Sequence, residues 1–315
     1  MANTKEIQRR IKSAGNTKKI TRAMEMVAAA KMRKSVDAVL RTRTYANLSW
    51  STVLNLSKAL KGDEHPAFTK KEKIEKVAIV LFSSNRGLCG AFNSAVINKA
   101  HQSIVKHHQE QATDFILVGR KGDGIHKHFG YNVMAEFPKS DANSEIKEVL
   151  PIAKMALADF FSGKYDKVLV AFTDFISASK QEPRIRQILP IDIEAEQQYL
   201  GIVGSDTRLK TTKEFIADKD EQHLSDEKFV YEYTFEPNPK MVLDEMIPRL
   251  IEIQLYQALL ESNASEHSAR MAAMHQATEA ANSMIDELTL FFNKARQAAI
   301  TSEIAEISAG ANALK

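Results

Sequence analysis

The sequence predicts an α/β protein whose two ends are very long helices that pair as a coiled coil. Three observations predict this fold class. Apolar residues recur every three or four positions through residues 240–315, and they do so again through much of residues 1–60. Between these segments, short apolar runs alternate with helical stretches. That alternation is typical of a small domain with a mostly parallel sheet.

The C-terminal segment, residues 239–315, carries the clearest of these patterns. Asn238 and Pro239 suit an N-cap and a first helical position, whereas Pro248 predicts a kink or a separate short leading helix. A helix from Arg249 to Ala309 would be about 90 Å long and would need a second long helix to cover its narrow seam. Twelve of the fifteen seam positions are apolar, and the seam is Leu250, Ile253, Gln257, Leu260, Ala264, His267, Met271, Met274, Thr278, Ala281, Ile285, Leu288, Phe292, Ala295 and Ala299.

Residues 1–60 supply a suitable partner helix. They contain no proline and one glycine, Gly15, whose cost of about 1 kcal/mol is too small to end the helix. Apolar rows with the same spacing run through 7–14 and 36–60, and the alanine-rich stretch 24–30 between them would let two helices approach closely. We expect this helix to stop at Gly62–Pro66.

The charge of the two ends is complementary. Residues 1–43 carry twelve Lys and Arg against three acidic residues, whereas residues 240–315 carry six against ten. This difference favours pairing of the ends, and the remaining basic excess predicts an acidic partner. Nucleic acid, anionic lipid headgroups and an acidic protein surface all fit that description, and a solvated basic face without a partner is the alternative.

The middle of the chain predicts a small Rossmann-like domain with a mostly parallel sheet. Its four expected strands are 76–82, 114–119, 131–137 and 167–172, separated by helices at about 92–109, 121–129 and 144–162. Residues 185–191 and 229–233 are interpreted as further strands, and the charged segment 194–228 as an insertion or loop. The expected domains are therefore 1–60, 75–235 and 239–315.

Composition favours a soluble intracellular protein. Among 315 residues there is one cysteine, Cys89, which excludes an intrachain disulfide. No apolar run approaches the length of a membrane span, and the charged N-terminus has no apolar signal core, so we interpret it as mature protein.

No motif makes a positive case for catalysis, a cofactor or a metal. The segment 83–93 follows the first strand, where α/β proteins bind phosphate, but it matches neither G-x-x-x-x-G-K-[ST] nor G-x-G-x-x-G. We interpret it as a tight strand-to-helix turn that uses two glycines. Cys89 has no base nearby in the sequence, and the histidine pairs 107–108 and 126/128 lack metal-ligand spacing.

Three long motifs carry a resemblance to a known family. Residues 7–32, running from Ile7-Gln8-Arg9-Arg10 through Asn16-Thr17-Lys18-Lys19 to Met32, resemble the opening of the gamma subunit of F-type ATP synthases. The segments 264–271 and 293–301 are similar to the closing helix of that family, and the loop 85–93 is similar to a third stretch of it. The segment 194–228 departs most from the family pattern.

The resemblance implies a central rotor shaft. In that family the two terminal helices form an antiparallel coiled coil inside a threefold ring of alpha and beta subunits. The α/β domain binds the epsilon subunit and the membrane ring of c subunits, whose proton-driven rotation is coupled to conformational changes at the beta catalytic sites. The chain itself would then catalyse nothing, hold no cofactor, and meet the membrane only through the complex, at the cytoplasmic face of a bacterial inner membrane or, alternatively, at an organellar inner membrane.

Five residues fall in the stretches of that family that contact the alpha–beta ring: Met24, Arg270, Arg296, Gln297 and Thr301. For Met24 the alternative is packing within the coiled coil, and for Arg270 it is a solvated helix face.

Two other classes of function stay open on the sequence. A coiled-coil protein could bind nucleic acid through residues 1–43, but few aromatic residues are available there for base stacking. An α/β enzyme with helical dimerisation arms is disfavoured because the phosphate loop is missing.

Overall fold

The computed structural model describes residues 4–59, 65–69, 71, 73–107, 111–140, 144–191, 236 and 238–313. These residues form two compact units. One, the helical unit, comprises Met1–Ala29 and Arg270–Lys315, and the other, the mixed unit, comprises Ala30–Ala269. The predicted strand 229–233 and the charged segment 194–228 lie outside the described residues.

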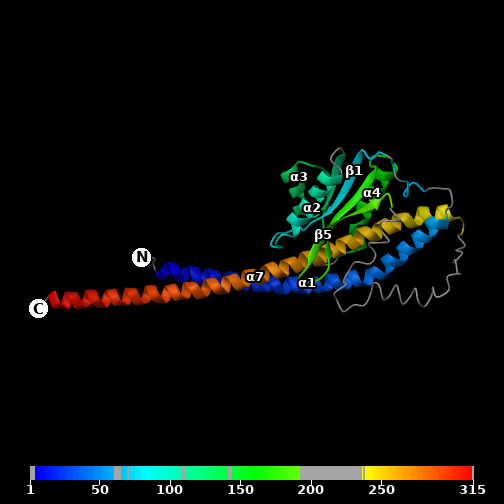
Figure 1. Ribbon diagram of the computed structural model, residues 1–315. Coiled ribbons are helices and arrows are strands. Elements are labelled where there is room, and N and C mark those ends of the chain that lie inside the picture. Colours follow the sequence, from blue (N-terminus) through cyan, green and yellow to red (C-terminus); the bar gives the residue numbers. More distant parts are fainter. Residues whose placement is uncertain are drawn as a thin grey trace. The chain divides into compact units, whose positions relative to one another are not determined.

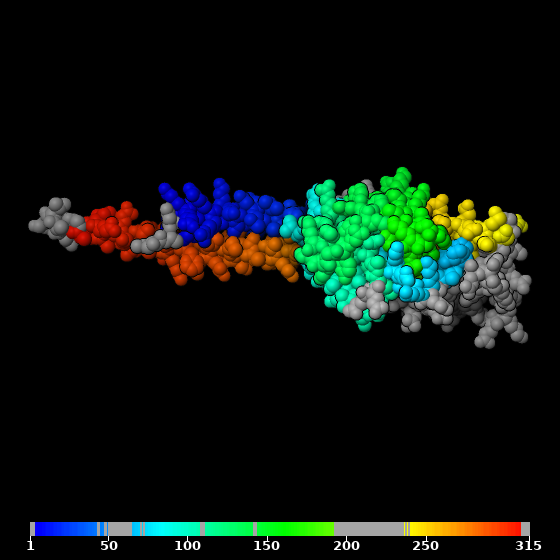
Figure 2. Space-filling view, turned by 90° about the horizontal axis from the view of Figure 1, so that it is seen from above, coloured from blue at the N-terminus to red at the C-terminus, as the bar shows by residue number. Residues whose placement is uncertain are grey.

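The two long helices that the sequence predicts are present. Helix α1 (Thr4–Ala59) continues past Gly15, and helix α7 (Pro239–Ala313) forms the C-terminal end. Asn238 caps α7 as expected, because its Oδ1 accepts a hydrogen bond of 2.9 Å from the backbone N–H of Met241. In the helical unit the first part of α1 lies beside α7, as the blue and orange segments in Figure 2 show.

The alternative of a separate leading helix before Pro248 is wrong. Helix α7 is continuous through this proline, although a proline in a helix interior costs about 3 kcal/mol. Its neighbours Ile247, Leu250 and Ile251 are each no more than 2% exposed. Burial of these side chains in one core outweighs the local cost of the proline.

The mixed unit contains a five-stranded sheet in the order β3-β2-β1-β4-β5. Figure 1 labels two of its strands, β1 and β5. The first four strands are parallel, and β5 pairs antiparallel with β4. The central strand β1 is buried on both faces, which explains its unbroken apolar run. The five predicted strands that fall on described residues are confirmed, with the bounds β1 (Lys76–Phe82), β2 (Ala112–Val118), β3 (Asn132–Phe137), β4 (Lys167–Phe175) and β5 (Gln181–Leu189).

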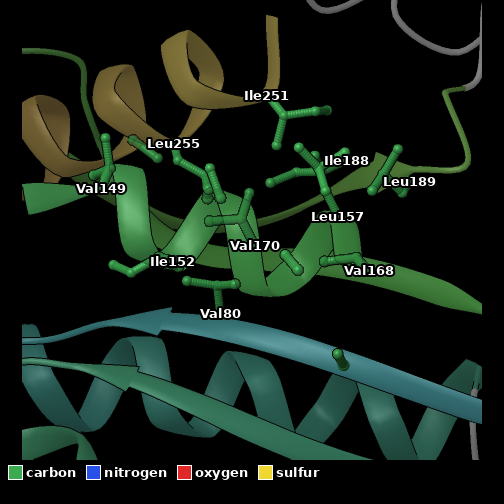
Figure 3. Packing of buried hydrophobic residues seen from close by; sticks show 14 of the residues in the cluster. Val80, Val149, Ile152, Leu157, Val168, Val170, Ile188, Leu189, Ile251 and Leu255 are labelled. Carbon is green, nitrogen blue, oxygen red and sulfur yellow. The ribbon is translucent and has the colours of Figure 1, made fainter. Parts of the chain in front are cut away.

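Helices cover both faces of this sheet. Helices α2 (Phe92–His107) and α3 (Gly124–Phe129) pack on one face, against Ile79, Phe115 and Leu169. Helix α4 (Leu150–Phe161) and the first part of α7 pack on the other, where Val80 and Val170 meet Ile152, Leu157, Ile251 and Leu255 (Figure 3).

Two predicted helices are interrupted. The expected helix 121–129 is divided into a 3-10 turn, η1 (Arg120–Asp123), and α3. The expected helix 144–162 is divided into η2 (Ile146–Glu148) and α4. Pro151 in the first turn of α4 explains the second break, because a proline at this position favours a new helix start over continuation of a preceding turn.

Candidate functional site

The candidate site is the helix pair of the helical unit. Within this unit the buried side chains of α1 are Ile7, Ala14, Thr21 and Ala28, spaced seven residues apart. This spacing is the heptad repeat of a coiled-coil seam. Three of these four α1 side chains are small, namely Ala14, Thr21 and Ala28.

On α7 the predicted seam is also confirmed. Its positions from Leu250 to Ala281 are buried, except for Gln257 and Met271, which are half-buried. From Ile285 to Ala295 the seam positions are half-buried, and Ala299 is exposed. On the α1 side of the mixed unit Val39 is buried, while the seam side chains from Trp50 to Leu60 lie outside the described residues.

Polar contacts fix the direction of the pair. The hydroxyls of Thr21 and Thr278 lie 2.8 Å apart in the seam, and Glu25 lies 3.3 Å from His275. Residue numbers therefore rise along α1 as they fall along α7, which makes the pair antiparallel. Each hydroxyl also lies near a carbonyl of its own helix, Thr278 Oγ1 at 2.8 Å from that of Met274 and Thr21 Oγ1 at 3.1 Å from that of Lys18, so either threonine can donate in the pair.

Helix α7 extends beyond α1. Counting back from the Thr21–Thr278 contact, the first helical residue of α1, Thr4, lies level with Ala295. Every side chain from Arg296 to Ala309 is exposed. Figure 2 shows this red part of α7 continuing past the blue end of α1.

This unpaired end of α7 carries an apolar stripe. Ile300, Ile304 and Ile307 are 49%, 59% and 66% exposed, and their spacing of four and three places them on one helix face. An exposed apolar stripe with polar and charged neighbours is typical of a surface that contacts another protein.

The five predicted contact residues all lie in the helical unit, but they do not form one site. Met24 and Arg270 are half-buried beside the paired seam, whereas Arg296, Gln297 and Thr301 are exposed on the unpaired end. Arg270 and Arg296 are separated by about 39 Å along the helix. Thr301 Oγ1 donates to the carbonyl of Gln297 at 2.9 Å, a bond within α7 that leaves the side chain of Gln297 in contact with solvent.

The first part of α1 presents a basic surface. Two of its arginines form surface ion pairs along the helix, Arg10 with Glu6 at 2.7 Å and Arg22 with Glu25 at 3.0 Å. Such pairs contribute only about 0–1 kcal/mol each. The exposed basic side chains are Lys5, Arg9, Arg10, Lys12, Lys18, Lys19 and Arg22.

The loop 83–93 is a closed turn rather than a phosphate cradle. Leu88 and Gly90 both have positive φ, 63° and 56°. The Oδ1 of Asn93 accepts the backbone N–H of Ser84 at 3.0 Å, so a donor at the end of β1 is already used. Cys89 is buried, and the hydrogen-bond partners that the structure gives its Sγ are Ser84, Asn93 and the Arg86 carbonyl, none of which is a general base.

Shifted pKa values in the mixed unit have structural causes. Burial alone would raise the pKa of Asp166, but hydrogen bonds from Lys71 Nζ and from the backbone N–H groups of Glu75 and Lys76 outweigh it and hold the pKa below its usual value. Burial raises the pKa of Tyr165, and its hydrogen bond to Asp114 raises it further. The side chains of Asp166 and Tyr165 therefore connect strands and loops through hydrogen bonds.

Two further features, a metal site and a membrane-spanning helix, are absent from the described part of the chain. It contains no group of three or more His, Cys, Asp or Glu side chains arranged to hold a metal ion. No helix among the described residues is long and apolar enough to cross a membrane.

Sequence reasoning missed two sets of contacts. One is the Thr21–Thr278 pair, signalled only by a polar residue interrupting the apolar seam. The other is in the mixed unit, where residues 261–268 of α7 are buried without exception. Their partners include Lys139 and Ser144, more than a hundred residues away in the sequence.

Comparison with known proteins agrees with this geometry. The family model described as ATP synthase matches residues 3–314. The ATP synthase gamma chain of Haemophilus influenzae is 34% identical over 316 residues, and that of an Azoarcus species is 37% identical over 317, each alignment covering the whole of both chains.

Solved structures share the fold. A chain of the Euglena gracilis mitochondrial ATP synthase, from a structure of the OSCP/F1/c-ring, superposes with a TM-score of 0.64 at 18% identity and covers 99% of this chain and 94% of its own. A chain from the central stalk and c-ring of the Tetrahymena thermophila enzyme gives a TM-score of 0.57 at 22% identity, covering 82% and 99%. With full-length relatives above 30% identity and a family model that spans the chain, this protein belongs to the ATP synthase gamma chain family.

Proposed function

We propose that this chain is the central rotor shaft of a proton-transporting ATP synthase. In this function the helical unit stands inside a ring of three alpha and three beta subunits, and the α/β domain binds the epsilon subunit and the c-subunit ring. Rotation of the c ring turns the shaft, and the shaft changes the conformations of the beta subunits in turn. In this function the chain has no nucleic-acid partner.

The single observation that carries this proposal is the unequal length of the two helices in a chain of the gamma family. Beyond Ala295 helix α7 is exposed and carries an apolar stripe, and no described residue of α1 lies level with it. Such an end suits a bearing inside another protein. It does not suit a soluble arm, because a soluble arm gains nothing from three exposed isoleucines.

The asymmetry of the pair supplies the coupling. A rod with a basic face on α1 and an apolar face on α7 cannot make the same contacts with three identical neighbours at once. Each beta subunit therefore meets a different surface, and its open–closed equilibrium shifts by no more than the difference in the shaft's affinity for the two states. Exposed charge contacts of about 0–1 kcal/mol can form and break at every turn.

In this proposal the chain has no catalytic residue and needs no cofactor of its own. ATP forms and is hydrolysed on the beta subunits. The chain would reach the membrane only through the c ring, as a peripheral protein on the cytoplasmic face of a bacterial inner membrane.

The proposed contacts to the ring are Met24 and Arg270 beside the seam, and Arg296, Gln297 and Thr301 on the unpaired end. Alanine at each of the last three positions should lower ATP hydrolysis by the assembled complex. The stability of the isolated chain should change by less than about 0.5 kcal/mol, because these side chains are exposed. Ser302→Ala, on the same exposed stretch, is the control, and equal activity in all four variants would contradict the assignment.

Co-expression with candidate alpha and beta subunits tests the function itself. We expect one complex with three alpha, three beta and one copy of this chain, and ATP hydrolysis that depends on that copy. A chain that stays outside the ring, or leaves hydrolysis unchanged, would overturn the proposal. Tight binding of duplex DNA that weakens steeply with salt would then favour the nucleic-acid function instead.

A further inference from the structure

The most polar stretch of α7 is also one of its most buried. Glu261, Ser262, Asn263, Ser265, Glu266, His267 and Ser268 are each no more than 7% exposed. Buried polar side chains are costly unless they find hydrogen-bond partners. The partners that the structure gives them show how the α/β domain holds this helix.

On one side, α7 is held by the loop that follows β3. Lys139 Nζ lies 2.6 Å from Glu266 Oε2, and the two side chains are only 1% and 3% exposed. The position of Lys139 is itself fixed, because its carbonyl accepts a hydrogen bond from the Nδ2 of Asn85, in the loop after β1. The ion pair thus joins α7 to the ends of two strands.

Ser144 in the same loop adds two further hydrogen bonds. Its carbonyl accepts the hydroxyl of Tyr256 at 2.9 Å, and its Oγ accepts the Nδ2 of Asn263 at 2.5 Å. Burial raises the pKa of Tyr256, and the nearby carboxylates of Glu148 and Glu145 raise it further, so this hydroxyl keeps its proton.

On the other side, α7 is held by the end of β4 and the turn that leads into β5. Ser265 Oγ donates to the carbonyl of Thr173 at 3.1 Å, and Ser268 Oγ donates to that of Ala178 at 2.6 Å. Gln181 Nε2 in turn donates to Ser268 Oγ at 3.2 Å. Ser265 and Glu266 are neighbours in sequence and point about 100° apart around the helix axis, so α7 is held from two directions.

The contacts nearer the start of α7 are of another kind. Ile251, Leu255 and Leu259 pack in the apolar core against α4 and the sheet. Apolar burial is strong but has no preferred direction, so by itself it resists rotation of a helix about its axis only weakly. A buried ion pair adds little net stability compared with apolar residues of similar size, but it can define one register.

We propose that the Lys139–Glu266 ion pair is the positioning contact that transmits torque from the α/β domain into α7. The surrounding hydrogen bonds, which Ser144, Thr173 and Ala178 accept and Gln181 donates, complete this polar clamp. The inference rests on the proposed function as a rotor. It assigns the transfer of rotation to one buried charge pair and not to the larger apolar contact.

The test replaces both charges by apolar side chains, Lys139→Met with Glu266→Leu, in the complete synthase reconstituted in vesicles. The chain should keep its melting temperature and the complex its ATP hydrolysis, because the two charges of this buried pair are removed together. Ion pumping per ATP hydrolysed should fall to a small part of the wild-type value. Wild-type pumping in this folded variant would overturn the inference.

A matched control removes an ion pair from the same helix without touching the clamp. Arg249 and Glu252 pair within α7 at 3.0 Å, so Arg249→Met with Glu252→Leu deletes the same two charge types. This variant should pump as the wild type does. Equal losses in both double variants would show a general effect of charge on α7 and would also overturn the inference.

If the apolar variant does not fold, the inference is tested with the exchanged pair, Lys139→Glu with Glu266→Lys. We expect it to pump better than Glu266→Gln alone, since it restores an ion pair at the same place. Pumping no better than that of the single variant would refute the inference. If even the wild-type chain supports no pumping with its partners, the proposed function fails, and the role of the clamp in rotation fails with it.

Discussion

The mixed unit and the helical unit use the same two helices in opposite ways. In the mixed unit α7 is surrounded: apolar residues such as Leu255 are fully buried, and the polar clamp holds residues 256–268. In the helical unit α7 has one neighbour, α1, along the paired seam, and past Ala295 it has none among the described residues. In the mixed unit the side chains of α7 are fixed by the residues packed around them, whereas in the helical unit much of the surface of α7 is exposed.

The difference shows that a continuous helix can pass between two mechanical roles without a break in its backbone. The change is made entirely by side chains and by what packs on them. The side chain of Leu255 is fully buried, whereas that of Ile304 is 59% exposed. The predictions below test whether stability belongs to the first region and contact with partners to the second.

The largest effect on stability is expected from a cavity in the mixed unit. Leu255→Ala should lower the free energy of unfolding by about 2–5 kcal/mol, because this fully buried side chain fills the core between α4 and α7. Ile304→Ala, the same kind of truncation on the unpaired end, should change it by less than about 0.5 kcal/mol. Denaturant unfolding of both variants measures the difference, and equal losses would contradict the comparison.

The next effect depends on pH. Asp166→Asn removes a carboxylate that accepts three hydrogen bonds, and it should cost about 2 kcal/mol near pH 7. Since the folded-state pKa of Asp166 is lowered, its contribution is complete above the unfolded value of about 3.9 and is lost as pH falls through the lower folded value.

Thermal unfolding between neutral and acid pH checks this prediction. The wild type should lose stability over that acid range, and Asp166→Asn should lose less over the same range. Asp37→Asn, which removes only an exposed partner of Arg41, is the control and should behave like the wild type. An Asp166→Asn variant with the full acid sensitivity of the wild type would contradict the assignment.

A smaller effect is expected in the helical unit. Thr278→Val breaks the 2.8 Å bond to Thr21 and should cost about 1 kcal/mol. Thr21→Val should cost a similar amount, and the double variant should cost less than the sum of the two, because the second change has no cross-helix bond left to break. A double-mutant cycle measured by thermal unfolding gives the coupling, and strict additivity would show that the pair contributes nothing.

The smallest effect on stability should accompany a large effect on function. A chain ended after Leu290 loses side chains that are mostly exposed, so the melting temperature should change little. Coupling in the assembled synthase should weaken, because the apolar stripe has gone. A chain ended after Ala309 keeps the stripe and serves as the control. Unchanged proton-driven ATP synthesis in the shorter chain would count against a role for this end.

Much of this fold follows from local patterns in the sequence. The three-and-four spacing predicted both long helices and most of the α7 seam, because the period of a helix is a property of each short window. The apolar runs predicted all of the described strands. The Asn238 cap was predicted for the same reason, since a cap depends on residues within one turn of each other.

The missed features depend on contacts between distant residues. Thr278 was visible as a polar interruption, but its partner Thr21 lies 257 residues away. Glu266 belongs to a motif that the sequence made conspicuous, but its burial depends on Lys139, 127 residues earlier. The periodicity of one helix predicts which of its faces is buried, but it does not predict which residues pack on that face. The polar clamp could therefore be identified only from the structure.

The separation of Thr21 and Thr278 along the chain also has a consequence for biosynthesis. Helix α1 leaves the ribosome first, and the seam that covers it leaves last, so α1 must wait for nearly the whole chain to be made. Parallel strands and late contacts of this kind fold slowly and expose apolar surface in the meantime. The α/β domain should therefore form first and receive α7, and α1 should close onto α7 as the final step. The basic charge on α1 would keep the waiting helix soluble until then.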